Sequence, residues 1–302
     1  MRKTYVDQVD LLLDVLPHAM KDKRFALKGG TAINLFYRDM PRLSVDIDLC
    51  YLPVEDRSTS FKNIHSILDT IKADLERLGF QVKPSKPLNG KSEVKLFVGS
   101  RNAEIKVEPN FTLRGSVFEP KTMTTKAAVI KEFGKEVDAN CLSLADLFGG
   151  KICAALDRQH PRDLFDIKYF LEKEGFTDEV RKSFIVYLIS HSRPMNKIIN
   201  PNLKDLSTVF TDEFHGMTTI EVTLDELIHA RVDLINAVQA NLTVHEKDFL
   251  LSLKDLNPKW NLLGLKGIDE LPAVKWKLLN LKKMDEKKRK TKRQLLEESL
   301  IG

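Results

Sequence analysis

Residues 44–51 read SVDIDLCY and place two carboxylates, Asp46 and Asp48, one residue apart inside an otherwise apolar segment. The segment is typical of a β-strand, in which successive side chains point to opposite faces, so both aspartates share one face and the apolar residues share the other. Like charges about 7 Å apart repel each other unless a positive charge lies near them. The acidic face of this strand therefore requires a metal ion, basic side chains or water beside it.

The composition excludes several classes of protein. The chain has 302 residues, 42% hydrophobic and 30% charged, which suits a globular protein of two ordinary domains or one large one. No apolar run is long enough to span a bilayer, and the first ten residues, MRKTYVDQVD, lack the apolar core of a signal peptide. Three separated cysteines, Cys50, Cys141 and Cys153, support neither a disulfide framework nor a thiolate zinc site. We expect a cytoplasmic protein with no membrane partner.

Positive charge is concentrated near the C-terminus. Residues 275–294 contain ten Lys or Arg and two acids, a net charge of +8, so the other 282 residues carry −3 of the total of +5. A basic segment of this kind binds polyanions by releasing their counterions. It is equally compatible with a solvated helix end that contributes only to solubility.

Hydrophobic periodicity predicts a mixed α/β domain up to about residue 140. Its expected elements are a helix over 6–17 ending at Pro17, a short apolar strand in the segment RFALK, a turn at Gly29 and Gly30, a helix opening near Thr31, the 44–51 strand, a helix over 60–78 closed by Gly79, and a hairpin of 93–100 with 103–111. The apolar stripe of the 60–78 helix is Phe61, Ile64, Ile67, Leu68, Ile71, Leu75 and Leu78.

The remaining sequence predicts helices. Helical periodicity covers residues 143–158, 162–175, 177–191, 223–242 and 245–253, and strand patterns nearly vanish after residue 141. The loop-like segment 132–141 blurs the boundary between the two regions. The expected fold class is α+β, with a mixed α/β domain carrying a small sheet over 1–140 and a helical domain over 141–302 that ends in the basic segment.

Two features of the first domain can bind phosphate and metal. Gly29 and Gly30 lie where a strand meets a helix N-terminus, and free backbone N–H groups there favour a phosphate, although such a pair is also an ordinary tight turn. Asp46 and Asp48 could hold one or two Mg²⁺ ions, because carboxylate oxygens are the ligands that hard cations prefer. The alternative is a pair of solvent-facing acids on an amphipathic strand.

A third carboxylate belongs to the segment IKVEPN. Its alternation puts Glu108 on the polar face, with Lys106, and a neighbouring position in the sheet would bring Glu108 beside the aspartates. There it could act as a general base or as a shared metal ligand that activates a hydroxyl. It could instead pair with a surface cation near the strand end.

Taken together, these features follow the pattern of nucleotidyltransferases related to DNA polymerase β. Four ordered segments resemble more closely the AbiEii/AbiGii toxin family of nucleotidyltransferases: LKGGTAINLFYRDMPRLSVDIDL, IKVEPNFTLRG, LADLFGGKICAALDR and PRDLFDIKYFL. The matching positions are Gly29, Gly30, Arg42, Ser44, Asp46, Asp48, Lys106, Glu108, Arg114, Gly115, Lys151, Arg158, Arg162, Asp163 and Asp166. The resemblance spans residues 25 to about 172.

The resemblance implies the toxin of a bacterial toxin–antitoxin or abortive-infection system that acts in phage defence. Such an enzyme would move NMP from an NTP, bound with Mg²⁺ or Mn²⁺, to an acceptor hydroxyl such as the tRNA 3′ end, and so block translation. A cognate antitoxin would be encoded nearby. The implied catalytic residues are Asp46, Asp48, Glu108, Lys151 and Asp163, of which the first three would bind metal. The implied nucleotide-binding residues are Gly29, Gly30, Thr31, Ser44, Lys151 and Arg158.

The residue chemistry leaves alternatives open. The acceptor could be a protein or a small molecule such as an aminoglycoside, or the chain could be a non-catalytic nucleotide- or nucleic-acid-binding module. Asp163, in the first turn of its helix, also suits a plain capping role, and Asp166 suits an ion pair with Arg162. Gly149, Gly150 and Ala154 around Lys151 favour a closely packed or ligand-adjacent helix over a fully exposed one.

Overall fold

The computed structural model describes residues 2–85 and 94–301. The chain divides into two compact units, unit 1 formed by Met1–Leu147 with His215–Glu221, and unit 2 formed by Phe148–Phe214 with Val222–Gly302. Residues 141–147, expected from the sequence in the helical domain, lie in unit 1. The segment 215–221 joins unit 1 through backbone hydrogen bonds from Leu43 N to the Met217 carbonyl and from Thr219 N to the Pro41 carbonyl.

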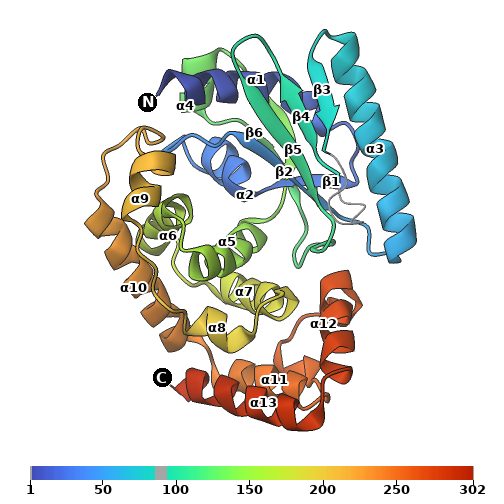
Figure 1. Cartoon of the computed structure of the whole chain (residues 1–302), viewed down its shortest axis with the longest axis vertical. Helices are drawn as coiled ribbons and strands as arrows, with labels where there is room; N and C mark the ends of the chain where they lie inside the picture. The colour runs from blue at the N-terminus through green and yellow to red at the C-terminus, as the bar shows by residue number, and fades with distance from the viewer. Residues whose placement is uncertain (1, 86–93, 302) are drawn as a thin grey trace. The chain divides into compact units, whose positions relative to one another are not determined.

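Unit 1 contains a seven-stranded mixed sheet with strand order β3-β4-β5-β2-β1-β7-β6 (Figure 1). Its elements are α1 Lys3–Ala19, β1 Phe25–Lys28, α2 Gly29–Thr31, the π-helical η1 Ala32–Tyr37, β2 Asp46–Tyr51, α3 Arg57–Arg77, β3 Gln81–Pro84, β4 Leu96–Gly99, β5 Glu104–Asn110, β6 Lys121–Thr124, α4 Ala127–Phe133 and β7 Asp138–Cys141. The expected hairpin is present as β4 and β5, which pair antiparallel. The expected 93–100 strand begins outside the described residues.

Alternation decides which face of the sheet is buried. Ile47, Leu49, Ile105 and Val107 are buried, while the acidic and basic residues between them reach the opposite face. Helix α1 packs on β2 and β5 and also on α3, so both helices belong to the apolar side of the sheet. The opposite face of β2 is consequently left for polar side chains.

Three details of unit 1 differ from the expectation. Helix α1 begins at Lys3 and continues past Pro17 to Ala19, because a proline in the last turn removes one hydrogen bond without ending the helix. Leu78 is exposed at the C-cap of α3, beyond the helical stripe. The segment 132–141 holds the end of α4 and the strand β7, whose alternating burial is too short to predict.

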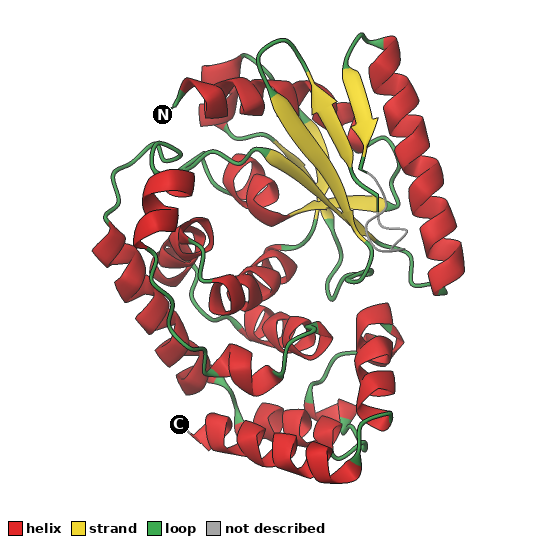
Figure 2. Cartoon of the chain, in the orientation of Figure 1, coloured by secondary structure: helices red, strands yellow, loops and turns green. Residues whose placement is uncertain are grey.

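Unit 2 is helical, and Figure 2 shows all the drawn strands in unit 1. Its helices are α5 Leu144–Arg158, which starts in unit 1, α6 Pro161–Lys173, α7 Asp178–Ser190, α8 Met195–Ile199, α9 Ser207–Val209, η2 Phe210–Phe214, α10 Leu224–Asn241, α11 Val244–Lys254, η3 Trp260–Leu262, η4 Ile268–Glu270, α12 Pro272–Lys282 and α13 Glu286–Ile301. The five helices predicted between residues 143 and 253 are therefore confirmed.

Local sequence explains several helix ends. Thr223 and Thr243 each form a capping box with the glutamate three residues later, which satisfies free N–H groups at the starts of α10 and α11. Pro161 occupies the first turn of α6, where its missing N–H costs nothing. The basic segment 275–294 is divided between α12 and α13. Among the described helices, none combines the length and apolar character needed to cross a membrane.

Candidate active site

The acidic face of β2 carries the first group of candidate residues. Strands β2 and β5 run parallel, with Asp46 opposite Lys106 and Asp48 opposite Glu108. Residues opposite each other in adjacent strands project from the same face, so the structure brings Glu108 beside Asp48. Lys28 in β1 lies opposite Asp48 on its other side. Lys28 and Lys106 therefore project from the same face as the two aspartates. The sequence analysis had placed Lys106 on this polar face but had not singled out Lys28.

The donor chemistry of this face suits a hard divalent cation, because the aspartates and Glu108 offer only carboxylate oxygens. Within residues 2–85 and 94–301, however, no three His, Cys, Asp or Glu side chains converge closely enough to form a metal cluster. The Glu108 carboxylate lies 3.5 Å from Lys95 Nζ, and its side chain is 49% exposed. The three predicted carboxylates therefore lie at neighbouring positions on one face of the sheet, but their side chains do not converge on one point.

The glycine turn lies directly against Asp48. Gly29 has φ of +72°, a conformation that favours glycine, and a Cβ there would lie 2.4 Å from Asp48 Oδ2. A Cβ on Gly30 would lie 2.6 Å from Arg42 Nη2 and 2.8 Å from Ser44 Oγ. Both glycines are needed because polar side chains of the site approach the backbone. The turn and the acidic strand, fifteen or more residues apart, form one structural unit.

Two hydroxyl groups hold this turn to β2. Thr31 Oγ1 donates to the carbonyl oxygen of Asp46 at 2.5 Å and lies 3.0 Å from Ser44 Oγ. Asn34 Nδ2 donates to the Gly30 carbonyl at 2.9 Å. Thr31 and Ser44, expected to bind nucleotide, are both buried and hydrogen-bonded within the protein. In this structure their hydroxyls fix the geometry of the loop and strand.

Asp146 is a buried residue that the sequence did not single out. Its carboxylate accepts hydrogen bonds from the backbone N–H groups of Val117 and Phe118, both at 2.9 Å, and from Ser143 Oγ at 2.8 Å. These contacts fix the loop that follows β5. The sequence does contain a pattern that could have identified Asp146, because a serine followed three residues later by an acid is typical of a capped helix start. The structure has this cap, since the Asp146 N–H donates to Ser143 Oγ.

The second group of candidates forms a charged cluster within unit 2. Lys151 Nζ, on α5, lies 2.9 Å from Asp163 Oδ1 and 2.9 Å from Asp166 Oδ2, both on α6. All three side chains are buried. Arg158 Nη2 lies 2.8 Å from Asp163 Oδ2, while its side chain remains 63% exposed. Asp166 therefore pairs with Lys151, whereas Arg162, the partner suggested by the sequence, lies 4.0 Å from Glu213.

The electrostatics of this cluster favour ionised carboxylates. Burial raises the pKa of Asp163, but the positive charges of Lys151 and Arg158 outweigh that effect and lower the pKa overall. Close packing of α5 surrounds Lys151: a Cβ on Gly149 would lie 2.6 Å from Ser183 Oγ and 2.8 Å from Phe184 N of α7. The small residues beside Lys151 thus serve helix packing.

Comparisons with known proteins agree with this architecture. The family model of the AbiEii nucleotidyl transferase toxins of type IV toxin–antitoxin systems matches residues 10–278. Among solved structures, the chain is similar in fold to MenT4, a nucleotidyltransferase toxin from Mycobacterium tuberculosis H37Rv. That match has 15% sequence identity and a TM-score of 0.60, and covers 93% of this chain and 95% of MenT4. No curated protein is significantly similar in sequence. Because the family model covers most of the chain, this protein belongs to the AbiEii family of nucleotidyltransferase toxins of type IV toxin–antitoxin systems.

Proposed function

We propose that this nucleotidyltransferase moves NMP from an NTP to the 3′ hydroxyl of tRNA and so blocks translation. The observation that carries the proposal is the register of β2 and β5, which sets Glu108 beside Asp48 on the face that Gly29 approaches. Carboxylates on adjacent strands, next to a glycine turn at a helix start, supply the oxygen ligands and N–H groups that a metal-bound triphosphate needs.

In this proposal, Asp46, Asp48 and Glu108 would hold Mg²⁺ or Mn²⁺. When bound, the metal neutralises phosphate charge and polarises the α-phosphoryl group. The backbone N–H groups of Gly29 and Gly30 would bind the triphosphate, with Thr31 and Ser44 maintaining the shape of the turn. The acceptor oxygen forms a bond to the α-phosphorus as the bond to pyrophosphate breaks, and Glu108 accepts the proton of the acceptor hydroxyl.

The unit 2 cluster has a separate proposed role. Lys151, buried between two carboxylates, would hold α5 to α6, and Arg158 would supply positive charge to a phosphate group. Asp163 would then act as a positioning residue, since it contacts both cations. The exposed part of Arg158 makes it the more accessible of the two.

The test of the chemistry uses purified protein, Mg²⁺ and each of the four NTPs labelled at the α-phosphate, with tRNA, total cellular protein or an aminoglycoside as acceptor. We expect label in tRNA. Label in protein or aminoglycoside would replace the tRNA acceptor with one of those classes. Omitting divalent metal, or adding EDTA, should abolish transfer.

Matched variants test the site. Glu108→Gln and Asp48→Asn should each lower the rate of transfer by roughly 100-fold or more, because they remove a proton acceptor or a ligand. Glu104→Gln is the control, since Glu104 lies on the same strand and the same polar face but four residues away. Equal losses for Glu104→Gln and Glu108→Gln would contradict the assigned site.

A cellular test addresses the toxin–antitoxin context. Expression of the chain should arrest growth, co-expression of the antitoxin encoded nearby should relieve it, and Asp46→Asn should remove the arrest. Arrest by Asp46→Asn equal to that of the unmodified chain would point to a non-catalytic binding protein.

A further inference from the structure

A buried arginine of unit 1 has no polar partner among the described residues. Arg114 lies in the loop that follows β5, and only 6% of it is exposed. Its Nε and Nη1 atoms are buried without a hydrogen bond, and within residues 2–85 and 94–301 no carboxylate forms an ion pair with it. A buried charge without a partner is unfavourable, so this arrangement indicates an anionic ligand.

A second arginine lies beside the first, at the start of α3. Arg57 Cζ is 4.4 Å from the centroid of the Phe61 ring, and Arg114 Cζ is 5.8 Å from the same centroid. Phe111 packs edge-to-face against Phe61, with the ring centroids 4.9 Å apart, and so fixes the ring. Arg57 is exposed and, like Arg114, has no ion pair with a described carboxylate. Two guanidinium groups, one buried and one exposed, therefore share one aromatic ring.

The nearby carboxylates have other hydrogen-bond partners. Glu55 accepts a hydrogen bond from the Tyr51 hydroxyl at 2.6 Å, and Asp56 caps the N-terminus of α3. Their charges raise the pKa of Arg114, but burial and the charge of Arg57 outweigh them, and the pKa is lowered overall. Neither carboxylate therefore replaces a bound anion at the arginine pair.

The loop that carries Arg114 crosses the acidic face of β2. Cys50 follows Asp48 by two residues, so alternation puts both side chains on the same face of the strand. Cys50 Sγ lies 3.3 Å from the carbonyl oxygen of Gly115 and 3.8 Å from that of Leu113, the residues on either side of Arg114. The backbone of Arg114 is therefore on the face of the candidate active site, about 7 Å beyond Asp48 along the strand.

The glycine turn lies toward the opposite end of this face. Lys28 is opposite Asp48 in the antiparallel pair of β1 and β2. Gly29, the next residue, therefore lies toward the start of β2, whereas Arg114 lies toward its end. In phosphoryl transfer the attacking and leaving oxygens lie roughly in line on opposite sides of the phosphorus. Since the turn is proposed to bind the triphosphate, the arginine pair is on the side of the acceptor.

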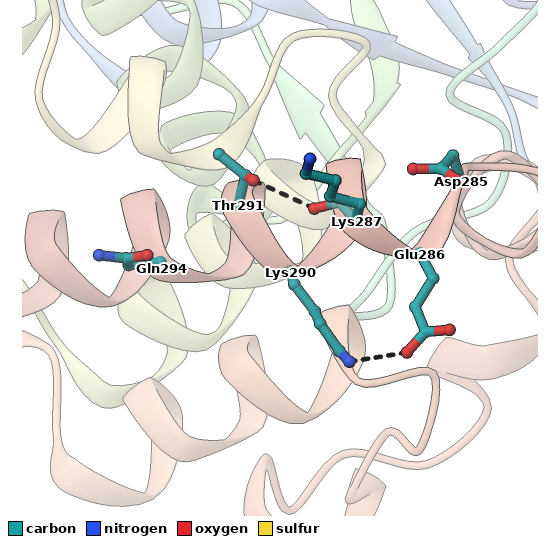
Figure 3. A pocket seen from close by; sticks show the side chains of 6 residues that line it. All are labelled: Asp285, Glu286, Lys287, Lys290, Thr291 and Gln294. Carbon is teal, nitrogen blue, oxygen red and sulfur yellow. Dashed lines mark hydrogen bonds and ion pairs between the residues drawn. The ribbon is translucent and has the colours of Figure 1, made fainter.

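Positive charge on α13 is compensated, in contrast to this pair. An open depression of about 570 Å³ there contains Lys290, whose Nζ lies 2.8 Å from the Glu286 carboxylate (Figure 3). Asp285 adds another negative charge to its lining. The depression therefore lacks the unpaired cations that make Arg57 and Arg114 a candidate for an anion.

We propose that Arg57 and Arg114 bind a phosphodiester of the acceptor strand, next to its reacting 3′ hydroxyl. The inference rests on the proposed function for the identity of the acceptor as RNA. No hydrogen bond holds the Arg57 side chain to a described residue, so it can rotate away from the ring and admit a phosphate. Arg114 would then donate charge-assisted hydrogen bonds to the phosphate oxygens, and Arg57 would add a second positive charge.

The first test measures binding of the full chain to a fluorescent single-stranded RNA by anisotropy, without NTP or divalent metal. Arg114→Met should weaken binding by about tenfold, because a charge-assisted contact is lost. The control is Arg101→Met, which removes an exposed arginine from the turn between β4 and β5. It should change affinity by less than about twofold.

A second test removes the charge from the RNA and does not depend on a variant folding. A methylphosphonate in place of the last phosphodiester should weaken binding to the unmodified chain by about tenfold. The same change several linkages further from the 3′ end should alter affinity by less than about twofold. Arg114→Met should bind the two modified RNAs and the unmodified RNA equally, because the partner of the last phosphate is gone.

Three results would overturn the site. They are an unmodified chain that does not bind RNA, equal effects of the terminal and inner methylphosphonates, and equal weakening by Arg114→Met and Arg101→Met. Competition by an oligoglutamate peptide that Arg114→Met abolishes would instead assign the pair to a carboxylate of a protein partner. Neither test needs nucleotidyl transfer, so the inference can fail while transfer to tRNA persists, and transfer can fail while RNA binding still depends on Arg114.

Discussion

At the scale of single residues, the candidate active site depends on the lack of a side chain at one position. Gly29 allows Asp48 to lie against the turn, since a Cβ there would come within 2.4 Å of its carboxylate oxygen. The positive φ of Gly29 adds a second reason for glycine at this position. Gly134, also in unit 1, has a similar φ of +65°, but a Cβ added there would meet no heavy atom within 4 Å. Gly29 therefore lies against a side chain of the candidate site, whereas Gly134 does not.

Gly29→Ala and Gly134→Ala separate backbone strain from displacement of Asp48. Both should lower the free energy of unfolding by about 1–2 kcal/mol, because alanine is disfavoured at positive φ. Only Gly29→Ala should also abolish nucleotidyl transfer, because it moves the Asp48 carboxylate. Urea denaturation and a transfer assay measure the two effects. Full activity of correctly folded Gly29→Ala would show that the position of Asp48 is not needed.

At the scale of elements, α5 is fixed by its approach to α7. Gly149 faces backbone atoms of α7, since a Cβ would lie 2.8 Å from both Phe184 N and the Ser183 carbonyl carbon. Gly150 faces the Tyr187 ring, with a nearest distance of 3.2 Å. Backbone atoms cannot move aside without shifting a helix, whereas an aromatic side chain can adjust.

Two adjacent glycines therefore predict opposite outcomes. Gly149→Ala should destabilise the protein by roughly 1–3 kcal/mol, because the forced separation of α5 and α7 outweighs the better helix propensity of alanine. Gly150→Ala should remain within about 1 kcal/mol of the unmodified protein, because the gain in helix propensity offsets the adjustment of one ring. Thermal and urea unfolding of both variants provide the measurement. Equal losses for the two would mean that contact with α7 is not what requires glycine.

At the scale of the whole molecule, charge is segregated along the chain: residues 275–294 carry +8 and the other 282 residues −3. Lys254, buried at the end of α11, is where this segregation affects stability, because burial and the charge of Lys292 both lower its pKa. Lys254 is protonated in both folded and unfolded states below pH 8, and its burial then opposes folding. Between pH 8 and 10.5 the unfolded chain binds the proton and the folded chain does not, so stability rises with pH.

Between about pH 8 and pH 10 the unmodified protein should gain on the order of 1–3 kcal/mol of stability relative to Lys254→Met. The comparison is needed because burial raises the pKa of Cys50, Cys141 and Cys153, which lowers stability over the same pH range in both proteins. Lys254→Met should be more stable than the unmodified protein near neutral pH, and this advantage should shrink by about pH 10. Urea denaturation midpoints at roughly one-unit steps across this pH range measure both. If the two proteins have parallel pH profiles, Lys254 is not the group responsible.

Local patterns were enough to predict much of the fold. The period-two alternation of β2 and β5 and the 3.6-residue period of α5, α6, α7, α10 and α11 are properties of consecutive residues, so they could be read directly. Strands β3, β6 and β7 have four residues each, as β1 and β4 do, but QVKP, KTMT and DANC hold only one or two apolar residues, too few for an apolar pattern to show. The return of residues 215–221 to unit 1 rests on backbone hydrogen bonds with distant residues, which no local pattern encodes.

The sequence by itself determined that Asp46 and Asp48 share a polar strand face, that a glycine turn precedes a helix, and which family the chain resembles. Only the tertiary structure decided that Asp48 lies opposite Glu108, that Lys151 is enclosed by Asp163 and Asp166, and that Lys277 donates to the carbonyls of His191 and Arg193. The physical reason is that alternation and helical period are set by the backbone within a few residues. Strand register and side-chain pairing are instead set by packing between residues far apart in the chain.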